Sequence, residues 1–413
     1  MTPEVKKRIE QIRQGIVPEG YKKTESGIIP NEWRVGQVSK CIEEYKFFSN
    51  DISHIPVYSS SRKGLVPQSD YYNQREAVET NLGYKVVPQG YVTYRHMSDD
   101  DVFHFNINKT GENVLVSSEY PVFTSSDNCD LSFLISVLNN TARFRYFCKM
   151  QKLGGTRTRL YLDNLKRYAL ALPPFDEQKK IAEILATQDK AIELQARKIE
   201  ELKKFKKGCL EKMFPRKGQK VPEKRFPGFT DDWEQRKAQD VADRFDNLRI
   251  PVAANLRVHG TTPYYGANGI QDYVEGFTHD GEFVLVAEDG ANDLKNYPVK
   301  CVNGRIWVNN HAHVLQGKAG IADNSFLAFA ISQSDIESLL VGGGRAKLNA
   351  ETLMSIEFRL PCLQEQYRIG EYLTQLDHLI TLHQRKLEEM KRRKKALVQL
   401  LLTGIAKTKG EVR

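Results

Sequence analysis

Side chains that could hydrogen-bond to a ligand gather in four short stretches rich in glycine, serine or asparagine. Arginine, lysine, asparagine and hydroxyl groups discriminate the edges of nucleic-acid bases, because their donors and acceptors have a fixed geometry. Each stretch could instead be a polar turn that caps a strand. The candidate base-reading residues are Tyr58, Ser60, Arg62 and Lys63 in the first stretch, Arg95 and His96 in the second, Tyr264, Tyr265 and Asn268 in the third, and Asn309, Asn310 and His311 in the fourth.

A Gly-Gly-x-Arg loop occurs twice, beginning at Gly154 and at Gly342. Basic side chains that contact backbone phosphates position a protein on a nucleic acid but carry no sequence information. A loop shared by both halves of a chain cannot distinguish sequences either, so it suits that role. The candidate phosphate anchors are Arg157, Arg159, Arg345 and Lys347.

The sequence lacks motifs for catalysis or metal binding. His311 and His313 alternate as on a strand, but no cysteine or carboxylate stands at ligand spacing, and two histidines do not make a zinc site. Leu172-Pro-Pro-Phe175 is like the Asn-Pro-Pro-Tyr motif of amino methyltransferases, yet Leu172 has no oxygen to accept a hydrogen bond from a target amine. No Walker loop, G-x-S-x-G elbow or Rossmann fingerprint occurs. We therefore expect no catalytic residues, and no metal or cofactor bound by this chain.

The elements that position these side chains are repeated along the chain. Residues 154–214 recur without a gap 188 positions later, and 16 of 42 positions are identical between 173–214 and 361–402. A weaker echo relates the stretch that ends at Trp33 to the one that ends at Trp233, 200 positions later. The stretches between are unlike. The chain therefore alternates variable and constant parts, which indicates internal duplication.

Each constant part predicts one long helix, because no proline interrupts it and apolar residues follow a four-three spacing. Asp176 is a plausible cap of the first helix. Both seams are interrupted by polar residues at matching places, Gln195 with His383 and Lys206 with Lys394, so we expect the two seams to bury each other with the helices antiparallel. A dimerising coiled coil, or two helices that each cover a local core, are the alternatives. The predicted packing residues are Ile181, Leu185, Ile192, Ile199 and Leu202 in the first helix and Ile369, Leu373, Leu376, Ile380, Leu387 and Met390 in the second.

The two variable parts mix short β-branched and aromatic runs with one helical stretch each, 131–150 and 325–340. The predicted fold class is mixed α/β (α+β), with two globular domains separated by two long antiparallel helices that form a coiled-coil spacer, and with a pseudo-two-fold internal repeat. The predicted divisions are an N-terminal helical segment 1–25, a first domain 26–172, a helix 173–215, a second domain 216–360, a helix 361–404 and a basic tail 405–413.

Composition narrows the class of protein. The chain has 61 Lys and Arg against 52 Asp and Glu, a net charge of +9, which favours a polyanionic partner. Its six cysteines are scattered without a C-x-x-C pair, so we expect reduced thiols in the cytoplasm. No apolar run approaches the roughly 20 residues of a membrane span, so we expect no membrane association.

The doubled arrangement resembles the specificity (S) subunit of type I restriction-modification systems. The resemblance covers nearly the whole chain, including a closing Leu-Leu-Leu-Thr-Gly at 400–404, and departs from the pattern only where Pro361-Cys362 replaces Pro173-Pro174. Single motifs are weak, but their doubling is specific. The residues that carry the resemblance are Pro173, Glu177, Gln178, Ile181, Leu185 and Asp189, repeated as Pro361, Glu365, Gln366, Ile369, Leu373 and Asp377.

The resemblance implies a non-catalytic subunit whose two target recognition domains each read one half of a bipartite, asymmetric site in double-stranded DNA, while the helices set the gap. It also implies two modification (M) subunits that use S-adenosylmethionine to methylate adenine, and restriction (R) subunits that use ATP and Mg²⁺. A stand-alone DNA methyltransferase or nuclease, or a coiled-coil scaffold that does not bind DNA, are the alternatives.

Overall fold

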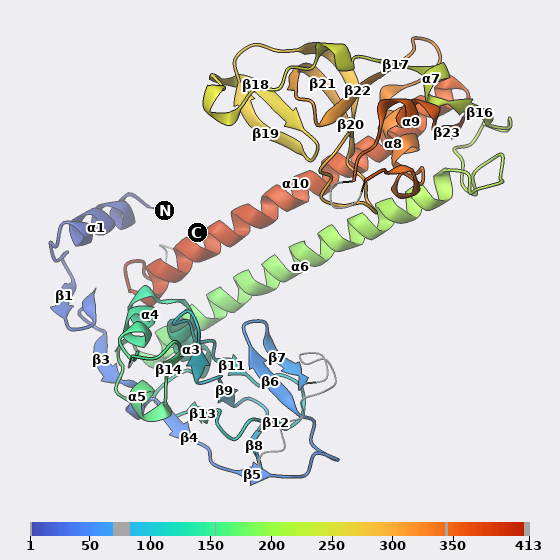
Figure 1. The fold of residues 1–413 in the computed structure, drawn as a ribbon. Helices are drawn as coiled ribbons and strands as arrows, with labels where there is room; N and C mark the ends of the chain where they lie inside the picture. The colour runs from blue at the N-terminus through green and yellow to red at the C-terminus, as the bar shows by residue number, and fades with distance from the viewer. Residues whose placement is uncertain (1, 69–82, 153, 343–345, 409–413) are drawn as a thin grey trace. The chain divides into compact units, whose positions relative to one another are not determined.

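The computed structural model describes residues 2–68, 83–152, 154–342 and 346–408. The chain divides into two compact units, Met1–Leu194 with Leu387–Arg413 (unit 1) and Gln195–Lys386 (unit 2). The long helices α6 (Phe175–Met213) and α10 (Leu363–Leu402) both cross from one unit to the other (Figure 1). Each unit therefore consists of one mixed α/β domain and a part of both long helices.

Unit 1 opens with α1 (Pro3–Arg13), which begins where the Thr2 hydroxyl accepts a hydrogen bond from the Val5 amide. The helical segment predicted for 1–25 ends there, because Tyr21–Thr24 is strand β1, paired with β2 (Gly27–Pro30) in a hairpin. The Tyr21 hydroxyl donates to the Gly404 carbonyl at 2.8 Å, and Ala406 is buried. The first residues of the predicted basic tail are therefore packed in the unit.

The first domain begins and ends in one antiparallel pair, β3 (Arg34–Gln37) with β15 (Ala169–Leu172). A four-stranded sheet in the order β11-β9-β13-β4 and a three-stranded sheet in the order β12-β8-β5 form its centre. Hairpin β6-β7 and pair β10-β14 form two further two-stranded sheets. The bounds are β4 Ile42–Glu44, β5 Phe48–Ser49, β6 Tyr58–Ser61, β7 Gly64–Pro67, β8 Tyr84–Val87, β9 Val92–Thr93, β10 Met97–Ser98, β11 Asn106–Ile107, β12 Val114–Val116, β13 Val122–Ser125 and β14 Thr158–Arg159.

The single helix predicted for 131–150 is wrong in one respect, because the chain forms two helices, α3 (Leu131–Asn140) and α4 (Ala142–Lys149). Thr141 between them has an extended backbone, with φ −88° and ψ 133°. Its hydroxyl donates to the Val137 carbonyl at 2.8 Å and accepts from the Phe144 amide at 3.4 Å. A threonine that satisfies both helix ends locally favours a break over a continuous helix. A short helix, α5 (Leu162–Lys166), follows β14.

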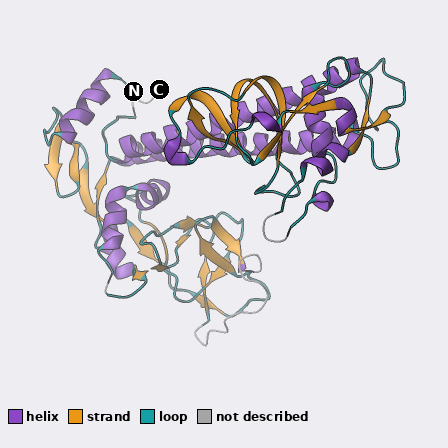
Figure 2. Ribbon diagram, turned by 45° about the horizontal axis from the view of Figure 1, so that its top comes forward, coloured by secondary structure: helices purple, strands orange, loops and turns teal. Residues whose placement is uncertain are grey.

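The second domain follows the same plan with a larger sheet. Strand β16 (Glu234–Lys237) pairs with β23 (Glu357–Leu360), as β3 does with β15. The six-stranded sheet has the order β17-β22-β20-β21-β18-β19, and α8 (Asn324–Ser332) packs on β20 and β21 (Figures 1 and 2). The helix predicted for 325–340 thus ends early, and only the 3₁₀ turn Glu337–Leu339 follows. The remaining bounds are α7 Ala238–Val241, β17 Ala242–Arg244, β18 His259–Gly266, β19 Gly269–Val274, β20 His279–Ala287, β21 Val299–Val308, β22 Ala312–Gly317 and α9 Ala350–Ser355, with 3₁₀ turns Val38–Lys40, Asp246–Leu248 and Ala254–Leu256.

The long helices pack along the predicted seam. In unit 1, Ile181 and Leu185 from the start of α6 share a core with Leu401 from the end of α10. In unit 2, Ile369 and Leu373 from the start of α10 share a core with Met213 from the end of α6. In both units the start of one long helix packs against the end of the other, which confirms the antiparallel pairing. Helix α6 begins at Phe175, so Asp176 lies in its first turn and does not cap it. Among the other predicted packing residues, Ile199, Leu202 and Ile380 are buried, and Ile192, Leu376, Leu387 and Met390 are half-buried.

Each polar interruption of the seam has a polar partner on the other long helix. Lys206 Nζ lies 2.6 and 2.7 Å from the two carboxylate oxygens of Asp377 in unit 2, and Lys394 pairs with Asp189 in unit 1. Lys206 and Lys394 are equivalent positions of the repeat, 188 residues apart, and so are Asp189 and Asp377. The two ion pairs are therefore equivalent to each other. Gln195 Nε2 lies 2.9 Å from His383 Nδ1 and donates to the His383 carbonyl at 2.8 Å. The repeat therefore reproduces contacts as well as sequence.

The repeated Gln residues explain how each long helix is fixed to its domain. Gln178 donates to the Pro173 carbonyl at 3.0 Å and accepts from the Asp130 amide at 2.9 Å. Gln366 does the same with the Pro361 carbonyl at 2.9 Å and the Asp323 amide at 3.0 Å. The carboxylates of these two aspartates cap α3 and α8. Each Gln thus ties the start of a long helix to the capped start of a domain helix.

The repeated Glu residues bind different partners. Glu177 accepts from Trp33 Nε1 at 3.0 Å, whereas Glu365 accepts two hydrogen bonds from Arg225, at 2.9 and 2.6 Å. Trp233 Nε1 is buried and finds no acceptor among the described residues. The duplicated motif has therefore diverged, because the glutamate accepts from a neutral indole in one unit and forms an ion pair with an arginine in the other. Within the described ranges, no helix is both long and apolar enough to cross a membrane.

Candidate nucleic-acid interface

A cavity of about 450 Å³ in the first domain brings the first two candidate stretches together. One wall is the β6-β7 hairpin, with Arg62 and Lys63 at its turn, and the opposite wall is the segment that follows β9, with Arg95. The hairpin can turn tightly because Gly64 has φ 113°. The residues that line the cavity are Ser60, Ser61, Arg62, Lys63, Val66, Arg95, Met97, Ser98, Asp99, Val102, Phe103 and His104.

Ser60 holds the hairpin in place. Its hydroxyl accepts from Asn106 Nδ2 at 2.8 Å and donates to the Thr93 carbonyl at 3.4 Å, and the residue is buried. Asn106 also donates to the Ser61 carbonyl at 2.9 Å. Ser60 is therefore committed to internal contacts, which leaves Arg62 and Lys63 as the exposed polar residues of this turn.

Three consecutive aspartates fix two arginines beside the cavity. Arg157 Nε donates to Asp99 at 2.8 Å, and Arg62 donates to Asp100 at 2.5 Å. The Thr158 hydroxyl donates to Asp101, which adopts a left-handed backbone with φ 62°. Desolvation would raise the pKa of Asp100, but hydrogen bonds from Ser98 and Arg62 outweigh it and hold the pKa below its usual value. The turn 99–101 therefore joins the hairpin to the glycine-rich loop that carries Arg157.

Arg95 and His96 face different surroundings. Arg95 is half-buried on the cavity wall and makes no hydrogen bond or ion pair with any described residue. His96 is buried and stacks on Tyr161 with 5.5 Å between ring centres. Burial lowers the pKa of His96 despite Glu119 nearby. His96 therefore lies out of reach of a ligand, whereas Arg95 is accessible from the cavity.

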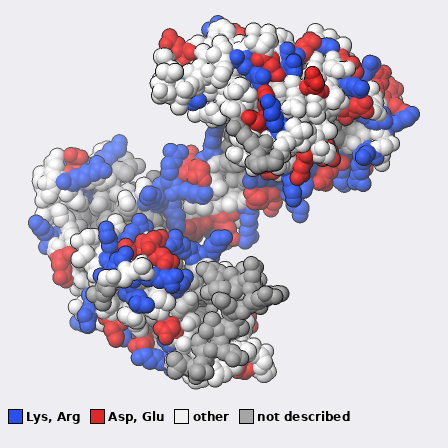
Figure 3. All heavy atoms as spheres, in the orientation of Figure 1, with Lys and Arg blue, Asp and Glu red and all other residues white. Residues whose placement is uncertain are grey.

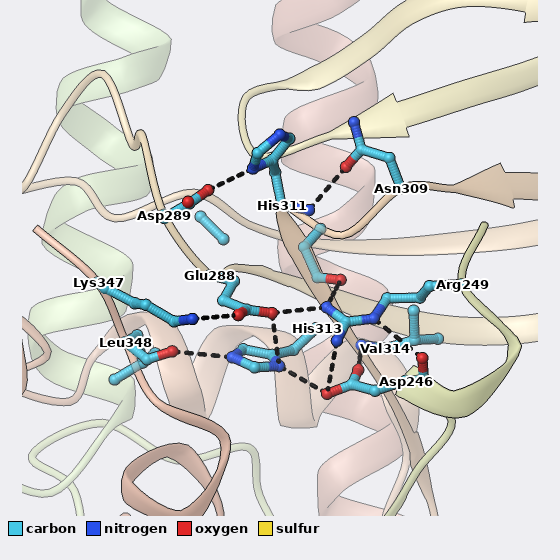
Figure 4. A network of polar contacts seen from close by, with 12 residues as sticks. Asp246, Arg249, Glu288, Asp289, Asn309, His311, His313, Val314, Lys347 and Leu348 are labelled. Atoms are coloured by element: carbon cyan, nitrogen blue, oxygen red, sulfur yellow. Dashed lines mark hydrogen bonds and ion pairs between the residues drawn. The ribbon is translucent and has the colours of Figure 1, made fainter. Parts of the chain in front are cut away.

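Candidate residues of the second domain form a network of polar contacts (Figure 4). His311 Nδ1 lies 2.5 Å from Asp289. Lys347 pairs with Glu288 at 2.8 Å, and Arg249 pairs with the same carboxylate at 2.7 Å. Burial would raise the pKa of Glu288, but the hydrogen bonds from Lys347 and Arg249 lower it below its usual value. Lys347, predicted to anchor a phosphate, is thus already paired with a carboxylate.

His313 lies at the centre of this network. Its Nδ1 is 2.7 Å from the Asp246 carboxylate and its Nε2 is 2.9 Å from the Leu348 carbonyl. Both partners are hydrogen-bond acceptors, a carboxylate and a backbone carbonyl, so each ring nitrogen lies beside an oxygen atom. Burial would raise the pKa of Asp246, but the hydrogen bonds from His313 and the Val314 amide lower it. The buried histidine therefore pins the segment after the second glycine-rich loop to strand β22.

The other candidates in the second domain are mostly internal. Tyr264 and Tyr265 are both buried, and the Tyr264 hydroxyl accepts from the Val252 amide at 2.9 Å. Asn309 is buried and accepts from the His311 amide at 2.8 Å. Asn268 bridges the Gly290 carbonyl and the Asn292 amide, at 2.8 and 2.9 Å. Tyr264, Tyr265 and Asn309 are therefore committed to the interior, whereas Asn268 is exposed and bridges two loop backbones.

Four candidates remain, and they are exposed, half-buried or outside the described residues. Asn310 and Arg159 are exposed, and Tyr58 is half-buried beside a small core of valines. Arg345 lies outside the described residues. Sequence reasoning missed the aspartates at 99–101 and the pair of Arg249 with Glu288. The run of three aspartates is visible in the sequence. Arg249 and Glu288 are 39 positions apart, and no sequence pattern links them.

The surface charge is mixed. Figure 3 shows Lys and Arg side chains interspersed with Asp and Glu on the face drawn of each unit. Neither sign of charge therefore dominates this face, so attraction to a polyanion is not uniform over it.

These features define a class of protein with two domains of one plan, each fixed to a long helix by a repeated Glu-Gln pair, and with different polar groups on equivalent loops. The family model for the type I restriction modification DNA specificity domain matches residues 35–204 and 230–392. The chain belongs to this family and carries its domain twice. The family predicted from the sequence is therefore confirmed.

Relatives with this domain match parts or all of the chain. The putative type I restriction enzyme specificity subunit S.HindORF215P of Haemophilus influenzae is 43% identical over 157 residues, which are 38% of this chain and 40% of that protein. The putative type I restriction enzyme MjaX specificity subunit of Methanocaldococcus jannaschii is 23% identical over 434 residues, covering 95% of this chain and 97% of that protein. The first match thus spans less than half of its relative, and the second spans nearly all.

Solved structures share the fold. The type I restriction-modification S subunit of M. genitalium superposes with a TM-score of 0.62 at 13% identity, covering 89% of this chain and 96% of that one. A chain from a study of complex assembly and conformational transition of the type I R-M system gives 0.50 at 14% identity, covering 91% and 99%. These likenesses confirm the mixed α/β fold with two long helices.

Proposed function

We propose that the two domains read the two unlike halves of a bipartite, asymmetric site in double-stranded DNA. The observation that carries this proposal is the doubling of a DNA specificity domain in one chain, with one plan and different loops. The first domain offers a cavity with the accessible cation Arg95. Because direct readout depends on the groups presented to base edges, unlike loops imply unlike half-sites.

The long helices serve as the spacer that sets the gap between half-sites and as the docking surface for two modification subunits. The exchanged ion pairs, Lys206 with Asp377 and Lys394 with Asp189, support this, because equivalent surfaces accept identical partners. Lengthening both helices by one heptad at equivalent positions preserves the seam. We expect that change to alter the gap and to leave both half-sites unchanged.

The chemistry belongs to partners in this proposal. Modification subunits bring S-adenosylmethionine and methylate adenine N6, and restriction subunits bring ATP and Mg²⁺ for translocation and cleavage. The complex acts in the cytoplasm, where the six free cysteines stay reduced. This chain determines the DNA sequence at which the partners act.

Methyl transfer from labelled S-adenosylmethionine separates recognition from catalysis. Purified chain, modification subunit and their complex are each incubated with DNA that contains the site. We expect transfer from the complex alone. Methylation by this chain without the modification subunit would overturn the assignment of its role.

A salt titration tests whether the binding reads sequence. Affinity of the complex is measured on the specific duplex and on a scrambled duplex of equal length. Phosphate contacts alone give a slope of log affinity against log salt of about −0.9 per contact on either duplex. We expect tighter binding to the specific duplex at every salt concentration. Equal affinity for both duplexes would instead support a scaffold that does not read DNA.

A further inference from the structure

The cavity of the first domain contains one arginine that differs from its neighbours. Arg62 and Arg157 are both exposed at the surface and both are held by carboxylates, Asp100 and Asp99. Arg95 is half-buried, lies on the cavity wall and has no hydrogen-bonding or ion-pair partner among the described residues. A partly desolvated guanidinium with its donors unused is costly unless a ligand satisfies them.

The walls of the cavity indicate what that ligand is. Asp99 lines it, and Asp100 and Asp101 continue the same turn. Asp99 and Asp100 are already paired with Arg157 and Arg62, so these two carboxylates do not decide between a phosphate and a neutral base. Val66, Val102 and Phe103 add apolar wall, which suits the flat edge of a base more than a hydrated phosphate.

A guanidinium presents two parallel N–H donors in one plane. The major-groove edge of guanine presents two acceptors, O6 and N7, at matching separation, and arginine is the side chain that most often reads it. Lysine at the same place would supply the charge without the paired geometry. The unused donors of Arg95 therefore match a guanine more specifically than any other base.

We propose that the cavity between the β6-β7 hairpin and the segment 95–104 receives the major-groove edge of a base pair in the first half-site, and that Arg95 determines specificity there by donating two hydrogen bonds to guanine. The turn 99–101 acts as a positioning element, because it fixes the hairpin and the glycine-rich loop around Arg95. This inference rests on the proposed function and adds a residue and a base to it.

The test uses the complex of the full chain with its modification subunit and a set of duplexes. Each duplex replaces one base pair of the half-site that changes when residues 33–172 are exchanged for those of a relative. Dissociation constants are measured for the wild type, Arg95→Ala, Arg95→Lys and the control Lys63→Ala, an exposed cation at the turn of the same hairpin.

We expect wild type to discriminate against replacement of one G·C pair by about 5- to 150-fold, the range for a good bidentate contact. Arg95→Ala should lose that preference, keep the preferences at the other half-site, and leave the salt slope nearly unchanged. Arg95→Lys should restore charge but little of the preference. Lys63→Ala should weaken all duplexes by a similar factor and reduce the magnitude of the salt slope by at most about 0.9.

The outcomes distinguish a failure of the role assigned to Arg95 from a failure of the proposed function. If the wild-type complex binds specific and scrambled duplexes equally, the proposed function fails. If the wild type discriminates but Arg95→Ala discriminates equally at every position, the assignment of Arg95 fails alone. It also fails if Arg95→Ala weakens all duplexes alike with a slope change of about 0.9, because that marks a phosphate contact. Should Arg95→Ala not fold, Arg95→Lys decides the question by the loss or retention of the guanine preference.

Discussion

Replacing Arg225 with methionine should destabilise unit 2 by about 3–5 kcal/mol, the usual cost of removing one partner from a buried ion pair. The side chain of Glu365 is 0% exposed and that of Arg225 is 14% exposed. Two hydrogen bonds join them, at 2.9 and 2.6 Å, and Arg225 also donates to the Asp231 carbonyl at 2.9 Å. Methionine retains part of the packing of the arginine stem, so the loss falls mainly on the unpaired carboxylate.

The neighbouring pair of Lys220 and Asp232 provides a matched control. Its N–O distance is 3.0 Å, but its side chains are 68% and 61% exposed. Solvent screens such a pair, so Lys220→Met should cost less than about 1 kcal/mol. The difference between the two substitutions isolates the effect of burial.

Guanidinium unfolding followed by tryptophan fluorescence measures both changes. A Trp33→Phe background leaves Trp233 and Trp307, which both belong to unit 2. Adding Glu365→Gln to Arg225→Met should recover a large part of the loss, because a neutral amide is less costly to bury than a carboxylate. The reasoning is refuted if Arg225→Met costs no more than Lys220→Met, or if the second substitution recovers nothing.

Three further predictions use the same unfolding assay. Leu373 is fully buried in the seam, whereas Leu382 is 45% exposed. Leu373→Ala should therefore lower the free energy of unfolding by about 2–5 kcal/mol and Leu382→Ala by about 0.5 kcal/mol or less. Equal losses would contradict the packing assigned to the seam. Gln366→Leu leaves the Asp323 amide and the Pro361 carbonyl without their partner and should cost about 1–3 kcal/mol, a prediction that an unchanged midpoint would refute. The pKa of Asp246 is lowered from its ordinary 3.8 in the folded chain, so its stabilising contribution is present above that pH and is lost as the pH falls below it. Asp246→Asn should therefore lower stability at pH 7 and flatten the acid dependence of unit 2, whereas parallel pH curves for both proteins would contradict the role assigned to this carboxylate.

The long helices could be predicted because two signals agreed, the four-three spacing and the gapless register of the repeat. Packing at Ile181 and Leu373 follows directly from that spacing. The ion pairs Lys206 with Asp377 and Lys394 with Asp189 could not be predicted, although both residue types were visible. They depend on the stagger of the two helices, which no local pattern encodes.

The candidate site was predicted less well, because turn residues point inward or outward according to strand register. Tyr264 and Tyr265 are adjacent yet both buried, since β18 carries a register shift between them. Alternation along a regular strand would expose one of the two. Ser60 and Asn309 were chosen by residue type, and both serve internal hydrogen bonds. Arg95 was chosen by the same rule, and only its burial and lack of partners distinguish it.

The central claim is that this chain recognises two separate DNA sequences, one with each of its two domains. Long-read methylation sequencing of a host that expresses it with its modification subunit tests that claim most directly, before and after residues 33–172 are exchanged for those of a relative. The account predicts a methylated motif with two unlike half-sites around a fixed gap. It also predicts that the exchange changes the sequence of one half-site and leaves the other half-site and the gap unchanged. A contiguous or palindromic motif, or an exchange that alters both half-sites together, would contradict it.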